Sequence, residues 1–220
     1  MNDTVLMVMS VRNIKSVVDS NNSLDCEKIY FIGHTEYELA PLINDFIKES
    51  NFKYYFITSD DTLIRKEKFE LLKYYLQFYP IVSGWCVTRQ NSHKTTIADK
   101  NKVKMNLGSN SGFISFSDVY YKTYEINKLP NIITSAFTGW IYTGMSKKIW
   151  EEYPFQTCRH PNASSDAAFS YNILKDGKYD QTIIKAARAV HISNADHTHS
   201  LQLGNSTDYY NFKRQIIKTF

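Results

Sequence analysis

The sequence contains few cysteines, and this shortage excludes a disulfide-stabilised scaffold. The three cysteines, Cys26, Cys86 and Cys158, are odd in number and stand at unrelated spacings. They match neither a disulfide framework nor a metal-binding motif. Because reduced thiols are the usual state in the cytoplasm, we expect a cytoplasmic protein.

The sequence also lacks a segment that would direct it to a membrane. No apolar run approaches the roughly 20 residues needed to span a bilayer. Residues 1–4 lack the basic opening of a signal peptide, and the apolar stretch 5–9 is too short to be one. We therefore expect a soluble protein without a transmembrane segment.

Two common nucleotide-binding fingerprints are missing as well. No Gly-x-Gly-x-x-Gly pattern follows the first apolar run, and no Gly-x-x-x-x-Gly-Lys-Ser/Thr loop occurs. The net charge of +4 suits a small anionic substrate but falls short of the basic stripe of a nucleic-acid binder. We expect no nucleic-acid partner, and a bound diphosphate would need a metal ion to neutralise it.

What the chain does contain is an alternation of strand and helix patterns over its first 90 residues. Apolar runs predict strands at 5–10, 28–32, 53–58 and 81–88. Apolar residues at helical spacing predict helices at 14–20, 38–49 and 66–78. This order predicts an α/β fold with an open, mostly parallel twisted sheet and helices on both faces.

The second half predicts a smaller, mixed or antiparallel arrangement. Short strands are expected at 103–107, 112–116, 132–138 and 183–192. Helices are expected at 146–152, 165–176 and 208–220, with Gly177 ending the second of them. The terminal helix has one apolar face, which favours packing on the core; peripheral docking on a membrane or a partner is the alternative.

An acidic pair ends the third predicted strand, at Asp60 and Asp61. An unpaired ionised carboxylate is costly to bury, but at the solvent end of a strand its oxygens suit a divalent cation. The alternative is a cap for the following helix, since Asp is favoured there.

Ligands of open parallel sheets bind beyond the carboxyl ends of the strands. Ser10 and Arg12 stand at that end of the first strand, and Glu36 follows the second. We expect them to line one crevice with the acidic pair. For Arg12, either a phosphate contact or a surface ion pair fits this position.

Four short segments then follow in a fixed order: Tyr-Phe-Ile-Thr-Ser-Asp-Asp at 55–61, Phe-Thr-Gly-Trp at 137–140, Pro-Phe at 154–155 with Ser-Ser-Asp at 164–166, and Arg-Ala-Val-His at 188–191. This order resembles the GT-A fold of nucleotide-sugar-dependent glycosyltransferases of the family 2 type, over roughly residues 5–195. The resemblance implies one domain over 1–220. Residues 1–90 would be its nucleotide-binding half, 100–200 its donor-sugar and acceptor half, and 208–220 its terminal helix.

The resemblance also implies roles for the acidic pair. Asp60 would contact the ribose and Asp61 would bind Mn²⁺ or Mg²⁺, with Glu36 reading the base. The usual motif in the family is Asp-x-Asp, and Ser59 stands here in the place of its first acid. His191 would complete the metal shell; a structural role, or ligation by His197 or His199 instead, are the alternatives.

Three further residues receive roles from the same resemblance. Gly139 and Trp140 would lie under the donor sugar and acceptor, although a tryptophan is commonly a core residue. Asp166 would be the catalytic base of an inverting transfer; its alternative role is a first-turn acid that complements the helix dipole.

The expected activity is metal-dependent transfer of a sugar from a nucleotide-diphosphate sugar to the hydroxyl of a saccharide, protein or lipid acceptor. One alternative is a nucleotidyltransferase, although the segment after the first strand lacks the glycines and basic residues that it needs. A non-catalytic carbohydrate- or nucleotide-binding module of the same fold is the other alternative.

Overall fold

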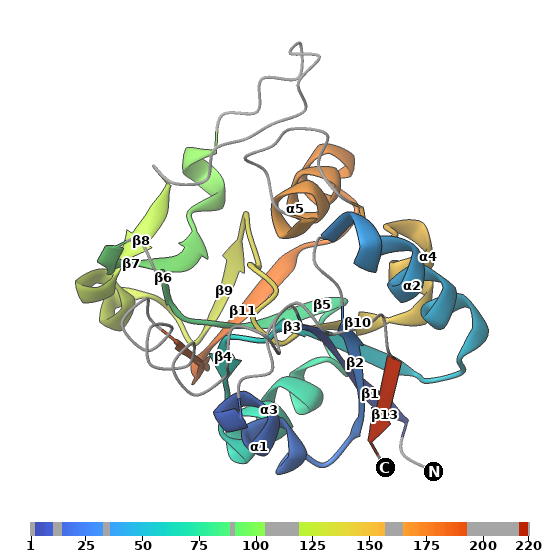
Figure 1. Ribbon diagram of the computed structural model, residues 1–220. Coiled ribbons are helices and arrows are strands. Elements are labelled where there is room, and N and C mark those ends of the chain that lie inside the picture. Colours follow the sequence, from blue (N-terminus) through green and yellow to red (C-terminus); the bar gives the residue numbers. More distant parts are fainter. Residues whose placement is uncertain are drawn as a thin grey trace.

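The computed structural model is an α/β fold built around one large mixed sheet (Figure 1). It describes residues 3–10, 15–32, 36–88, 91–103, 119–156, 165–192 and 216–219. The predicted fold class is therefore confirmed at this level.

The large sheet has eight strands in the order β13-β2-β1-β3-β10-β5-β11-β9. Their bounds are β1 Thr4–Ser10, β2 Glu27–Ile32, β3 Tyr54–Ser59, β5 Ile81–Trp85, β9 Ile132–Ser135, β10 Thr143–Ser146, β11 Gln181–Arg188 and β13 Ile216–Thr219. Strands β2, β1, β3, β5 and β11 run parallel, whereas β13, β10 and β9 run against them. The carboxyl ends of the parallel strands consequently meet at one edge.

Helices cover both faces of this sheet, as the sequence predicts (Figure 1). Their bounds are α1 Lys15–Asn22, α2 Glu36–Glu49, α3 Lys66–Tyr75, α4 Lys147–Glu152 and α5 Ser165–Asp176. One core cluster joins α2, α4 and α5 to side chains such as Met7 and Tyr55. A second cluster joins α3 to Leu6 and Phe56, which are the chain neighbours of Met7 and Tyr55 in β1 and β3. Because alternate residues of a strand point to opposite faces, both sets are buried and the strands read as continuous apolar runs.

Two smaller sheets flank the main one. β4 (Thr62–Leu63) pairs with β12 (Val190–His191), and β6 (Val87–Thr88) pairs with β7 (Asn91–Ala98), which in turn pairs with β8 (Tyr120–Lys122). Two 3₁₀ turns, η1 (Lys100–Lys102) and η2 (Thr123–Lys128), follow β7 and β8. The expected strands 103–107 and 112–116 lie outside the described residues except for Val103, which is not in a strand.

The predicted terminal helix over 208–220 is wrong at residues 216–219, which form β13 and pair antiparallel with β2; residues 208–215 lie outside the described part. Without β13, this side of β2 would expose a row of unpaired backbone groups. Ile216 and Ile217 are β-branched and suit a strand. An amphipathic helical face for membrane or partner docking therefore does not form at these four residues.

The described residues contain no helix that is both long enough and apolar enough to span a membrane.

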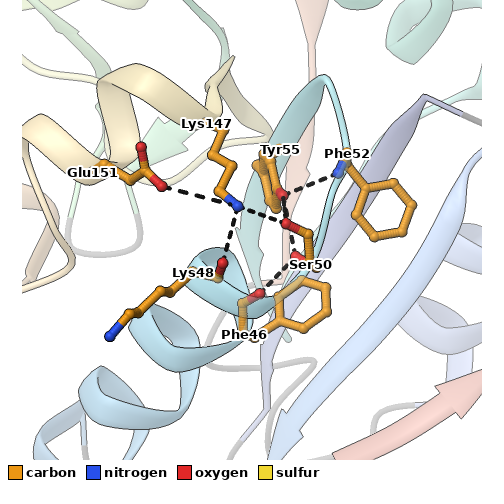
Figure 2. Close-up of polar contacts among 7 residues, drawn as sticks. All are labelled: Phe46, Lys48, Ser50, Phe52, Tyr55, Lys147 and Glu151. Carbon is orange, nitrogen blue, oxygen red and sulfur yellow. Dashed lines mark hydrogen bonds and ion pairs between the residues drawn. The ribbon is translucent and has the colours of Figure 1, made fainter.

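The shortest α-helix among the described residues, α4, is fixed to α2 through its first residue. Lys147 Nζ donates to the carbonyl oxygens of Lys48, at 3.0 Å, and Ser50, at 2.8 Å, where α2 ends (Figure 2). Cations stabilise the carbonyl end of a helix, so Lys147 attaches α4 to α2.

We expect Lys147→Met to lower the free energy of unfolding by about 1–2 kcal/mol, because two charge-assisted hydrogen bonds are lost at a partly buried position. Urea unfolding followed by circular dichroism measures the change. The matched control is Lys148→Met, since Lys148 is exposed. Equal stability of the two variants would contradict the attachment of α4 to α2 by Lys147.

Candidate functional site

The acidic pair lies where β3 ends, at the carboxyl edge of the parallel strands. Asp60 and Asp61 are only 3% and 2% exposed. Ser59 Oγ donates to Asp61 Oδ1 at 2.5 Å. Ser59 therefore orients the second carboxylate by a hydrogen bond, a role that the comparison with Asp-x-Asp motifs missed.

The structure brings His191 to this pair from 130 residues along the chain. Strand β12 places His191 opposite Thr62 of β4, and the amide of Ile192 donates to the carbonyl oxygen of Asp61 at 2.8 Å. His191 Nε2 consequently lies 3.5 Å from Asp61 Oδ2, with the imidazole 18% exposed. The two side chains predicted to share a metal are neighbours.

A buried polar cluster contacts the residues on either side of the acidic pair, Thr58 and Thr62. Thr58 Oγ1 lies 2.6 Å from Thr62 Oγ1. The Tyr142 hydroxyl lies 3.0 Å from the carbonyl oxygen of Thr62 and 2.8 Å from Asn21 Oδ1, and its single proton is shared between these two acceptors. Burial raises the pKa of Tyr142, so its phenol stays a neutral donor. The loop of the acidic pair thus has little freedom to move.

The donor atoms at this edge fit a hard divalent cation in part. Asp61 supplies carboxylate oxygens and His191 an imidazole nitrogen on the same side. No group of three or more His, Cys, Asp or Glu side chains that could hold a metal occurs among the described residues. Mg²⁺ is usually held by one or two carboxylates together with substrate phosphates, and not by a cage of protein ligands. The residues present fit that shared kind of site.

The Gly-Trp segment forms a turn with unusual backbone angles. Gly139 has φ +64°, and two residues with side chains, Trp140 and Tyr142, have φ +47° and +52°. Left-handed angles cost a residue with a Cβ about 1–2 kcal/mol each. Such strain persists only where the surroundings enforce it, and it gathers at functional sites.

The indole of Trp140 lies in the core and not at the surface, where it could stack on a sugar. Its side chain is 3% exposed and stacks against Trp150 and Phe155, with ring centroids 5.7 and 5.8 Å away. The left-handed backbone turns this indole into the core, where its Nε1 donates to Ser165 Oγ at 2.8 Å. The core alternative for Trp140 is the one observed.

Asp166 lies in the first turn of α5 and is half-buried. Its Oδ1 accepts from the amide of Ala167 at 2.7 Å, so the first-turn contact considered as the alternative role is present. Burial, and to a lesser degree the charge of Asp166, raise the pKa of the Tyr120 phenol. Asp166 is thus a carboxylate at the start of α5 whose Oδ1 accepts a backbone hydrogen bond.

The other predicted nucleotide contacts stay predictions. Arg12 lies outside the described residues, as do His197 and His199. Ser10 ends β1 and Glu36 opens α2, and only their backbones are described. Both follow the carboxyl ends of parallel strands, which is the edge where the acidic pair lies.

Two cavities lie away from the acidic pair. One of about 420 Å³ is lined by residues such as Tyr153, Asn172 and Asp176 near the end of α5. The other, of about 270 Å³, is lined by Tyr54, Pro80 and Ser146 among others, at the amino edge of the parallel strands. We assign the site by chemistry, since neither cavity brings together carboxylates and a nearby imidazole.

Comparison with known proteins supports the fold. No family model matches the chain, and neither does any curated protein. Among solved structures it is similar to the crystal structure of A197 from STIV, with 12% sequence identity and a TM-score of 0.58 over 87% of this chain and 85% of that one. At this identity the likeness shows a shared α/β fold and nothing of the activity.

Proposed function

We propose that the protein is a metal-dependent glycosyltransferase of GT-A type that uses a nucleotide-diphosphate sugar. The observation that carries this proposal is the buried pair Asp60 and Asp61 at the carboxyl end of a parallel strand, with His191 3.5 Å from Asp61. This edge of an open sheet is where ligands bind, and carboxylate oxygens are the ligands that Mg²⁺ prefers. The order of the four resembling segments supports the same reading.

In this proposal each acid has one task. Asp60 accepts a hydrogen bond from a ribose hydroxyl, and Asp61, oriented by Ser59, holds Mn²⁺ or Mg²⁺ with His191. The ion, when bound, stabilises the leaving diphosphate. Asp166 takes the proton of the acceptor hydroxyl. The hydroxyl oxygen forms a bond to the anomeric carbon while the bond from that carbon to the nucleoside diphosphate breaks. A single displacement of this kind inverts the anomeric configuration.

Calorimetric titration with nucleoside diphosphates tests the proposal before any acceptor is known. We expect Mn²⁺ to tighten binding of at least one nucleoside diphosphate by about tenfold or more, which is about 1.4 kcal/mol. EDTA or Asp61→Asn should abolish that gain, because the first removes the cation and the second removes its carboxylate ligand. Asp180→Asn is the control, since Asp180 forms an exposed ion pair with Lys100. Affinity that ignores the metal in the wild-type protein would overturn the role of Asp61.

A further inference from the structure

The strained turn 139–142 reaches both faces of the large sheet through two buried side chains. Trp140 belongs to the core cluster with α2, α4 and α5, whereas Tyr142 belongs to the cluster with α3. Both residues have left-handed backbone angles. The turn therefore places one buried aromatic side chain, here called an arm, on each face of the sheet.

The Tyr142 arm ends at the acidic pair. Its hydroxyl donates to the carbonyl oxygen of Thr62, the residue that directly follows Asp61. Thr62 is also the residue opposite His191 in the β4–β12 pair. A shift of Tyr142 would consequently move Asp61 and His191 together.

The Trp140 arm ends at the start of α5. Its indole Nε1 donates to Ser165 Oγ, and Ser165 directly precedes Asp166. The indole also packs on Phe169, one turn further along α5, with ring centroids 4.9 Å apart. The orientation of the first turn of α5 therefore depends on Trp140.

The turn itself is fixed to the central strands. The amide of Gly84 donates to the carbonyl oxygen of Ile141 at 2.9 Å. Ser83 Oγ lies 3.2 Å from the carbonyl oxygen of Thr138 and 2.8 Å from Thr143 Oγ1, at the two ends of the turn. These contacts with β5 hold the left-handed angles, so displacement of one arm is resisted by the sheet.

We propose that Trp140 and Tyr142 are positioning residues, which set the placement of the Asp60–Asp61 loop relative to Asp166. This inference rests on the proposed function for its catalytic consequence. The strain of the turn is then explained by this role, because in a regular strand residues 140 and 142 would point to the same face of the sheet, whereas here they belong to the clusters on opposite faces. Strained backbone that surrounding contacts enforce is a recognised sign of a functional site.

The test removes each hydrogen bond and keeps an aromatic ring, with Tyr142→Phe and Trp140→Phe. Amide hydrogen exchange is measured over 60–64 and 165–168. We expect Tyr142→Phe to speed exchange at 60–64 alone and to weaken Mn²⁺-dependent nucleoside diphosphate binding by about tenfold. Trp140→Phe is expected to speed exchange at 165–168 alone and to lower kcat for transfer by about tenfold at unchanged nucleotide affinity.

Matched controls come from other parts of the core. Tyr55→Phe and Trp85→Phe each remove a side-chain hydrogen bond to a backbone carbonyl oxygen, that of Ser50 and that of Lys185, and are expected to lower Tm without either local change. Ser165→Ala removes the acceptor of Trp140 without a change in the indole, and should reproduce the exchange at 165–168.

The outcomes separate the inference from the proposed function. If amide exchange rises equally in both segments, or rises no more than in the control variants, the positioning role is overturned. The turn is then an ordinary part of the core. The expected split in exchange, with no nucleotide bound by the wild-type protein, would sustain the positioning role and overturn the glycosyltransferase proposal.

Discussion

Asp166→Asn is expected to lower the rate of sugar transfer by about 10²–10⁴-fold while nucleotide affinity stays unchanged. The factor is that of a general base in the transition state. An amide cannot accept the proton of the acceptor hydroxyl at neutral pH. The proposed nucleotide contacts are at the acidic pair, at the end of β3 and next to β12, and do not include this side chain.

The substitution is conservative for the fold, which makes its outcome decisive. Asp166 Oδ1 accepts from the amide of Ala167, and the amide oxygen of asparagine can accept the same hydrogen bond. The lost charge at the start of α5 costs stability by only about 0.3–1 kcal/mol. A loss of transfer at nearly unchanged Tm would therefore report on chemistry and not on unfolding.

The measurement pairs turnover with binding. Single-turnover transfer gives the chemical rate, and calorimetric titration with the nucleoside diphosphate and Mn²⁺ gives the affinity. Asp180→Asn, an exposed acid four residues after the end of α5, should change neither quantity. Full transfer by Asp166→Asn would limit this residue to its first-turn hydrogen bond.

The sequence predicted the first half of the fold because its signals are local. Strands β1 and β3 are buried on both faces, so they read as apolar runs, and α2 and α3 show helical spacing. Strand β10 was missed because Thr-Gly-Met-Ser has no strand pattern. Its antiparallel place between β3 and β5 depends on contacts about 60–90 residues away in sequence, which no local pattern encodes.

Some features of the candidate site could also be predicted from the sequence, and others could not. The nearness of Asp61 and His191 was implied by the resemblance to GT-A glycosyltransferases, and the structure forms it through the antiparallel pair of β4 and β12. The Ser59 hydrogen bond could not be predicted, since it depends on the side-chain directions at the end of β3. The inward rotation of Trp140 could not either, since it depends on the left-handed backbone of the turn 139–142. Tyr142 carries no sequence signal at all beyond its place in an aromatic-rich segment.

Gly144→Ala is expected to destabilise the fold by about 3 kcal/mol or more, through overpacking of the central sheet. A Cβ at this position would lie 2.4–2.7 Å from three ring atoms of Phe56. The ring is fully buried and packs on Phe69 at a centroid distance of 4.9 Å. The backbone of Gly144 is paired with Phe56 on one side and Val82 on the other, so neither strand can withdraw.

Urea unfolding of Gly144→Ala and Gly177→Ala separates this clash from a general cost of replacing glycine. Gly177 ends α5 at φ +68° with no atom within 4 Å of an added Cβ, so its substitution costs only the backbone strain, about 1–2 kcal/mol. Phe56→Leu in the Gly144→Ala background should recover part of the loss, giving a coupling energy between neighbours. If the two glycine variants were equally stable and Phe56→Leu gave no recovery, Phe56 would not be the side chain that requires glycine in β10.

If the coupling is observed, the absence of a side chain at Gly144 is what lets the antiparallel strand β10 lie between the parallel strands β3 and β5. That insertion brings the turn 139–142 to the edge where Asp61 lies.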